Sequence, residues 1–123
     1  DCHLRHGEVL HGCIVKRNAM VGVNAVVMDR AVVGEESIVA AMSFVKAGMV
    51  IPPRSMVMGA PARVMRELTD KDVAWKSFGT QQYHDLAVRS MQTMREVDAL
   101  TEVEADRKRI DVGPDMHAPK DTK

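Results

Sequence analysis

An aliphatic side chain returns every six residues along the first half of this chain. The positions are Val9, Val15, Val21, Val27, Val33, Val39, Val45, Ile51 and Val57. A period of six fits neither a helix nor one long alternating strand, so the repeat itself is the structural unit. Four residues after these aliphatics the side chain is small, as in Cys13, Ala19, Ala25, Ala31, Ser37, Ser43 and Ser55, with Met49 as the exception.

This pattern predicts an all-β solenoid of short parallel strands, in which the recurring aliphatic points inward and the small residue sits near a bend. With three hexads in each coil, residues eighteen apart stack at about 4.8 Å, so Val9 is expected below Val27. Residues 9–62 then supply about three coils. Pro52-Pro53 and Gly59-Ala60-Pro61 are expected to end the winding, because proline cannot donate to a strand ladder.

Two helices are expected after the solenoid. Thr69 and Asp72 have the spacing of a capping box and predict a helix from about Asp70 to Phe78. Gly79 is expected to interrupt it, and a second helix is predicted from about Thr80 to Val97. The apolar face of the second helix is expected to pack along the outside of the solenoid, and it carries Tyr83, Leu86, Ala87, Ser90, Met94 and Val97.

The chain therefore divides into a solenoid over residues 1–66, C-terminal helices over 67–97 and an extended or disordered tail over 98–123. Because the chain opens at Asp1 within the repeat pattern, earlier coils are expected to precede it.

Composition excludes several classes of protein. The 17 basic and 17 acidic side chains balance, and no dense basic patch indicates a nucleic-acid partner. No apolar run has the length of a membrane span. The two cysteines, Cys2 and Cys13, do not form a disulfide framework, and the phase of Cys13 predicts a buried thiol. We therefore expect a cytoplasmic protein.

Three histidines near the N-terminus form the candidate site: His3, His6 and His11, with only His84 and His117 elsewhere. Neutral imidazole is a common metal ligand, and zinc takes three or four such donors. In the hexad pattern His11 is outward and aligned with Asp29 and Ala47. Extended backward, the pattern places His6 outward as well, aligned with Asn24 and Met42.

Because these positions lie on different faces, we expect an ion bound by both histidines to be shared between subunits. Apolar side chains at the outward positions of Val23, Ala41 and Met42 favour such an interface. The alternatives are exposed histidines with no ligand role and a mononuclear site of Cys2, His6, His11 and Cys13. Tyr83 is expected to serve in packing, and His84 and His117 to be solvated.

The hexads, His6-x4-His11-Gly-Cys13, the segment 21–29 and the ending Gly59-Ala60-Pro61-Ala62 resemble the gamma-class carbonic anhydrase family. Within that family, residues 34–48 and the helix around Trp75 and Tyr83 are similar to proteins of phenylacetic acid degradation and of the carnitine operon. The resemblance covers residue 3 to about residue 110. It implies a left-handed parallel β-helix with a C-terminal helix, assembled as a homotrimer with metal at the subunit interfaces.

Residue by residue, the resemblance implies that His6 and His11 are two of three histidine ligands, contributed by neighbouring subunits, for Zn²⁺ or another divalent metal such as Fe²⁺ or Co²⁺. The third ligand and the catalytic residues lie upstream in the family and have no match in this chain. His3 does not match a ligand. Arg5 and Arg30 stand where relatives usually have glycine.

The implied function is a metal-dependent thioesterase that hydrolyses acyl-CoA of the hydroxyphenylacetyl-CoA type, with possible gamma-carbonic anhydrase activity. The activated nucleophile would be a water molecule acidified by the metal. Two alternatives stay open: a hexapeptide-repeat acyltransferase, which uses a histidine base without metal, and a non-catalytic assembly module.

Overall fold

The computed structural model describes residues 1–108 of the chain. Nine two-residue strands come first: β1 (His3–Leu4), β2 (Val9–Leu10), β3 (Ile14–Val15), β4 (Met20–Val21), β5 (Val26–Val27), β6 (Val32–Val33), β7 (Ile38–Val39), β8 (Phe44–Val45) and β9 (Val50–Ile51). Two longer strands, β10 (Ser55–Gly59) and β11 (Ala62–Glu67), and one helix, α1 (Asp70–Thr93), follow.

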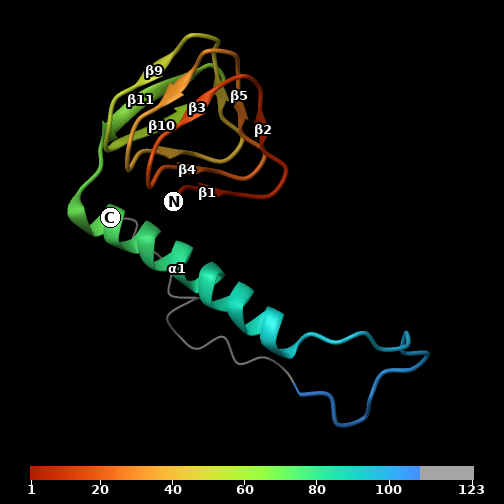
Figure 1. Ribbon diagram of the computed structural model, residues 1–123. Coiled ribbons are helices and arrows are strands. Elements are labelled where there is room, and N and C mark those ends of the chain that lie inside the picture. Colours follow the sequence, from red (N-terminus) through yellow and green to blue (C-terminus); the bar gives the residue numbers. More distant parts are fainter. Residues whose placement is uncertain (109–123) are drawn as a thin grey trace. The chain divides into compact units, whose positions relative to one another are not determined.

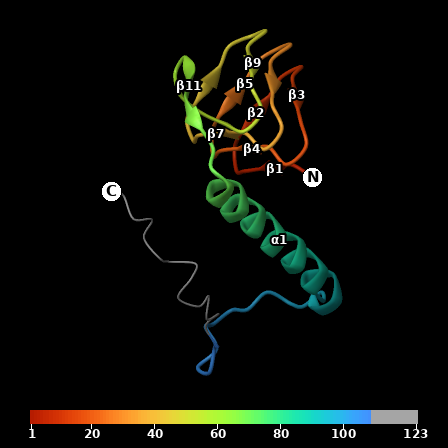
Figure 2. The ribbon, with the colours of Figure 1, turned by 90° about the vertical axis from the view of Figure 1, so that its left-hand side faces the viewer.

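The strands wind into the predicted parallel solenoid (Figures 1 and 2). Among β1 to β10 every third strand pairs in parallel, which gives the sheets β1-β4-β7-β10, β2-β5-β8 and β3-β6-β9, and β11 extends the first sheet beside β10. From β3 onward the parallel partners are eighteen residues apart, as for Val15 and Val33 or Val21 and Val39. The strands are short because the chain turns a corner after every pair of strand residues.

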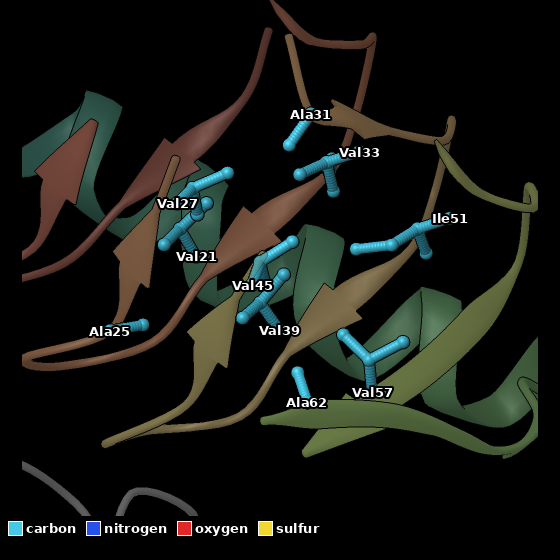
Figure 3. Packing of buried hydrophobic residues seen from close by; sticks show 11 residues of the cluster. Val21, Ala25, Val27, Ala31, Val33, Val39, Val45, Ile51, Val57 and Ala62 are labelled. Atoms are coloured by element: carbon cyan, nitrogen blue, oxygen red, sulfur yellow. The ribbon is translucent and has the colours of Figure 1, made fainter. Parts of the chain in front are cut away.

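The interior is filled by the recurring aliphatics, whose side chains point toward one another in Figure 3. Seven aliphatics are almost completely buried: Val21, Val27, Val33, Val39, Val45, Ile51 and Val57. The small residues of the repeat are buried beside them, including Ala19, Ala25 and Ala31. Cys13 packs against this core but is only partly buried, although a buried thiol was predicted. Short side chains are required because the corners of the coil approach the central axis closely.

The register differs from the prediction in the first coil. Val9 pairs with Val26, and Leu10 pairs with Val27. Leu10, and not Val9, therefore continues the row of inward-facing aliphatic residues that includes Val27. Val9 is half exposed. The turn between β2 and β3 is one residue shorter than the other turns between successive two-residue strands, which shifts everything before it by one position. Consecutive aliphatics at Val9 and Leu10 concealed the shift, because either residue could face inward.

The corners use left-handed backbone conformations. Positive φ angles recur every six residues from 18 to 54, at Gly48 and at the non-glycine residues Asn18, Asn24, Arg30, Glu36, Met42 and Arg54. Asparagine tolerates this region better than most residues, whereas a long side chain is unusual there. Arg30, with a φ of 57°, stands at such a corner, but Arg5 does not have a positive φ. Of the two arginines that stand where relatives usually have glycine, only Arg30 therefore has a backbone conformation that favours glycine.

The winding ends later than Pro52-Pro53, contrary to the prediction. These prolines lie in the turn between β9 and β10, and β10 still pairs in parallel with β7. The winding stops at β11, which reverses direction and pairs antiparallel with β10. The Ala60-Pro61 peptide bond between them is cis. The second predicted stop is therefore the correct one.

Helix α1 is one continuous element, so the predicted break at Gly79 is wrong. The capping box at its start is confirmed: the Thr69 amide donates to the Asp72 carboxylate (2.9 Å), and the Asp72 amide donates to the Thr69 hydroxyl (3.3 Å). Leu68 and Val73 pack on Met20, Ile38 and Met56, which are the outward residues of the first sheet. This contact and the bonds of Lys76 to Asn18 hold the start of the helix on the solenoid.

The later part of α1 does not pack along the solenoid as predicted. Leu86 is 43% exposed and Met91 is 87% exposed, and the predicted apolar face is open from Tyr83 onward. Residues 94–108 form a second unit without helix or strand, so the predicted helix does not reach Val97. The tail predicted over 98–123 extends beyond residue 108 and to that extent lies outside the described residues, as does His117. No helix among the described residues is long and apolar enough to cross a membrane.

Candidate functional site

His11 lies on the short turn between β2 and β3 and contacts a carboxylate. Its Nδ1 is 3.0 Å from Oδ1 of Asp29, and both side chains are largely exposed. The sequence correctly aligned these two residues one coil apart. Because a carboxylate accepts a hydrogen bond, Nδ1 carries the proton in this contact, and the lone pair of the neutral ring is on Nε2. The imidazole thus has a fixed tautomer and an unused donor atom that is open to solvent.

His6 occupies the preceding corner, between β1 and β2. Its carbonyl accepts the Asn24 amide (3.0 Å), and its side chain is exposed. Because β1 pairs with β4 at an offset of seventeen residues, His6 aligns with Val23 and not with Asn24 as predicted. His6 precedes strand β2 and His11 follows it, so the two residues lie at opposite ends of the strands of the β2-β5-β8 sheet.

Within residues 1–108, no three His, Cys, Asp or Glu side chains converge to hold a metal ion. The mononuclear alternative of Cys2, His6, His11 and Cys13 is therefore wrong for the described chain, because Cys13 remains packed against the core. His6 and His11 each offer a nitrogen donor, which suits zinc, but they do not form a ligand set by themselves. Their role as ligands stays a prediction.

A pocket that the sequence did not indicate lies between the first coil and α1. It has a volume of about 300 Å³, and its lining includes His3, Arg5, His6, Thr80, Tyr83 and His84. His3 closes one side: its Nδ1 is 3.1 Å from the Thr80 hydroxyl, and its ring meets the Tyr83 ring edge to face at 5.1 Å. His3 and His6 are far from Tyr83 and His84 in sequence, so only the docking of α1 brings the two pairs together.

Hydrogen bonding fixes the tautomer of His3 as well. The Thr80 hydroxyl donates its proton to the Lys76 carbonyl (3.1 Å), so it must accept from Nδ1–H of His3. Burial lowers the pKa of His3 below its usual value, and the positive charges of Arg5 and Lys76 and the nearby His84 lower it further. His3 is therefore held neutral, in a surrounding that already carries positive charge.

The outward faces of the solenoid differ in what covers them. The line of Met20, Ile38 and Met56 is covered by Leu68 and Val73. The outward lines of the other two sheets are not covered within the described chain, and they consist of Val9, Val26 and Phe44 on one sheet and Ile14, Val32 and Val50 on the other. Met42, predicted to face outward, is 70% exposed. Two adjoining faces are thus apolar and open.

No family model matches the chain. Curated relatives do: the carnitine operon protein CaiE of Citrobacter koseri is 56% identical over 108 residues, which are 88% of this chain and 55% of that protein. CaiE of Salmonella newport is 53% identical over the same length, covering 88% of this chain and 54% of the relative. The chain spans about half the length of these relatives.

Solved structures are similar to the chain as well. A candidate acetyltransferase from Bacillus cereus superposes with a TM-score of 0.73 at 31% identity, covering 76% of this chain and 54% of that one. A hexapeptide transferase family protein from Anaplasma phagocytophilum gives a TM-score of 0.62 at 31% identity, covering 72% and 49%. The chain is thus similar to a member of the hexapeptide transferase family over 72% of its length. Its solenoid is the left-handed β-helix of that family, as the resemblance implied.

A serine acetyltransferase from Brucella abortus, solved with coenzyme A, is also similar. It gives a TM-score of 0.53 at 26% identity and covers 56% of this chain and 30% of that one. The solved proteins similar to this chain thus include one that binds coenzyme A.

Proposed function

We propose that this chain contributes His6 and His11 to a divalent-metal site between subunits of a homotrimeric hydrolase that acts on acyl-CoA thioesters. The observation that carries the proposal is the contact between His11 and Asp29. Metal-binding histidines usually donate their second ring N–H to a carboxylate or carbonyl, which orients the ring toward the ion. His11 has this arrangement, with Nε2 left for a metal.

The open apolar faces support the subunit arrangement. Val9 and Ile14, on adjoining sheets, are both at least half exposed. Burying such faces against neighbouring copies removes apolar surface from water and stabilises an oligomer. His6 and His11 lie at opposite ends of the strands of one of these sheets, so packing of copies side by side would place His6 of one subunit near His11 of the next. Further donors would come from outside residues 1–108.

In this proposal the residues of the chain have distinct tasks. His6 and His11 hold a zinc-type ion through their ring nitrogens, and Asp29 keeps His11 in the tautomer that has its lone pair on Nε2. The bound ion would supply Lewis acidity, which polarises the thioester carbonyl and lowers the pKa of water. The same chemistry would hydrate carbon dioxide. The similarity to a protein solved with coenzyme A supports a CoA thioester as substrate.

The test is the metal content of the protein expressed from its native gene. We expect about one divalent ion per subunit. We expect His11→Ala to lose the ion and Asp29→Asn to bind it about 10- to 100-fold more weakly, because Asn cannot hold the ring as strongly. His117→Ala is the matched histidine control and should retain full metal. A His11→Ala protein with undiminished metal and unchanged hydrolysis of CoA thioesters would contradict the proposal.

A hexapeptide-repeat acyltransferase is the second candidate, and the transferase names of the similar solved structures favour it. It predicts transfer of the acyl group to an acceptor other than water and full activity after treatment with a chelator. Loss of hydrolysis after chelation, with recovery on adding Zn²⁺, Fe²⁺ or Co²⁺, would decide for the metal-dependent hydrolase. A folded oligomer without either activity would indicate an assembly module.

A further inference from the structure

The pocket between the first coil and α1 contains positive and hydrogen-bonding groups without an acidic partner. None of the residues that line it is acidic. The guanidinium of Arg5 makes no ion pair or hydrogen bond with any other residue in the part of the chain that the structure describes, although its Nε is buried. A buried charged donor without a partner is costly, so such groups are usually satisfied by an ion, a ligand or water.

Other donors surround the same space. Over residues 1–108, the imidazoles of His6 and His84 and the hydroxyl of Tyr83 have no hydrogen-bond partner in the chain and line this pocket with Arg5. They come from two places: the corner after β1, which holds Arg5 and His6, and helix α1, which holds Tyr83 and His84. His3 forms a fixed wall, because Thr80 and Tyr83 hold its ring. A ligand here would receive donors from several directions.

We propose that this pocket binds a phosphate group, with Arg5 as its main charged contact. A phosphate has several acceptor oxygens and can take bonds from the Arg5 guanidinium, the His84 imidazole and the Tyr83 hydroxyl together, whereas a carboxylate has only two oxygens. The volume of about 300 Å³ is at the lower end of small-molecule sites, so it suits one phosphate-bearing fragment. The phosphate is either a free ion or part of a nucleotide-containing substrate.

The primary test is calorimetric titration with inorganic phosphate at constant ionic strength, compared with acetate. We expect saturable binding of phosphate and at least about tenfold weaker binding of acetate, because a charge-assisted bidentate contact favours the multivalent anion. Imidazole NMR signals of His3 and His84 should shift during the titration. Equal binding of acetate, or no saturable binding of phosphate, would overturn the proposal.

The matched variants are Arg5→Gln and Arg30→Gln, which remove the same charge. Arg30 is exposed on a corner outside the pocket. We expect Arg5→Gln to weaken phosphate binding at least about tenfold and Arg30→Gln to leave it unchanged. Should Arg5→Gln fail to fold, His84→Gln on α1 replaces it, with about threefold weaker binding expected. Equal losses in Arg5→Gln and Arg30→Gln would show a nonspecific charge effect and contradict the proposal.

Two further measurements complete the test. One identifies the source of the phosphate, and the other distinguishes this proposal from the metal site. Coenzyme A binding more tightly than inorganic phosphate, with the gain lost in dephospho-coenzyme A, supports a nucleotide-borne phosphate. Equal affinities support free phosphate. Phosphate binding should persist after chelation and in His11→Ala, since His11 does not line the pocket. Loss of phosphate binding in the metal-free protein would overturn the proposal, whereas failure of the metal site alone leaves it standing.

Discussion

The imidazole of His3 connects two parts of the fold through single atoms. Nδ1 donates to Thr80, and the ring meets the Tyr83 ring edge to face. This one side chain of the first coil therefore contacts α1 at two points. Burial, and then the positive charge of Arg5 and Lys76 and the nearby His84, lower the pKa of His3. Protonation of His3 in the folded chain is therefore unfavourable, while an unfolded chain carries no such penalty.

We expect the free energy of unfolding to fall as the pH drops below 6.5, the ordinary pKa of His3. Above that pH the ring is neutral in both states. Below it the unfolded chain takes up a proton that the folded chain resists, until the pH reaches the lowered folded pKa. Urea unfolding in phosphate-free buffer should show a smaller change with pH in His3→Gln than in the wild type. His117→Gln is the control, and identical pH dependence in His3→Gln and wild type would contradict this role.

At the scale of the element, α1 shows how tertiary contacts and a good cap override a local break. The Thr69 and Asp72 box begins the helix, and Arg66 holds the Asp72 carboxylate at 2.8 and 3.0 Å. The Arg66 bond and the Thr69 bonds hold the pKa of Asp72 well below its usual range. Lys76, buried against Asn18, anchors the next turn, and burial lowers its pKa. Gly79 then lies between these contacts and those of Thr80 and Tyr83 with His3.

We expect Gly79→Ala to stabilise the protein by about 0.8–1 kcal/mol, because alanine loses less backbone entropy in a helix. A Cβ at this position meets nothing within 4 Å. Gly48→Ala is the opposite control: its Cβ also meets nothing within 4 Å, but its φ is +71°, so it should destabilise by about 1 kcal/mol or more. Thermal unfolding of both variants checks the pair. A loss of stability in Gly79→Ala would contradict the continuous helix.

At the scale of the whole molecule, the solenoid depends on coils that approach closely at their corners. A Cβ on Gly22 would stand 2.5 Å from the Ala41 backbone nitrogen, and one on Gly34 would stand 2.5 Å from the Ile51 carbonyl oxygen. Hydrogen-bonded neighbouring strands leave no space for these atoms to move. The glycines at these two positions are therefore required by stacking between coils and not by their φ angles.

We expect Gly22→Ala to destabilise the protein by about 1–3 kcal/mol, because the added methyl overpacks a backbone contact between two coils. Ala41→Ser, on the exposed corner opposite, should change stability by less than about 0.5 kcal/mol. Chemical unfolding monitored by circular dichroism measures both. A Gly22→Ala protein as stable as the wild type would show that the coils can separate at this corner.

The hexad pattern was enough to determine the solenoid, its inward valines and the small residues at its corners, because each coil repeats the same local packing problem. The sequence also placed the helix start, through Thr69 and Asp72, and the neighbourhood of His11 and Asp29. These features depend on residues that are near one another or an exact repeat apart.

Tertiary structure decided the rest. The register of the first coil depended on one missing residue, which the sequence could not reveal because Val9 and Leu10 are both aliphatic. The continuity of α1 through Gly79 came from anchors on the solenoid that outweigh a cost of about 1 kcal/mol. The pocket formed by His3, Arg5 and Tyr83 exists only because α1 docks beside the first coil. Contacts between distant segments carry no local signal, so only the folded chain could place them.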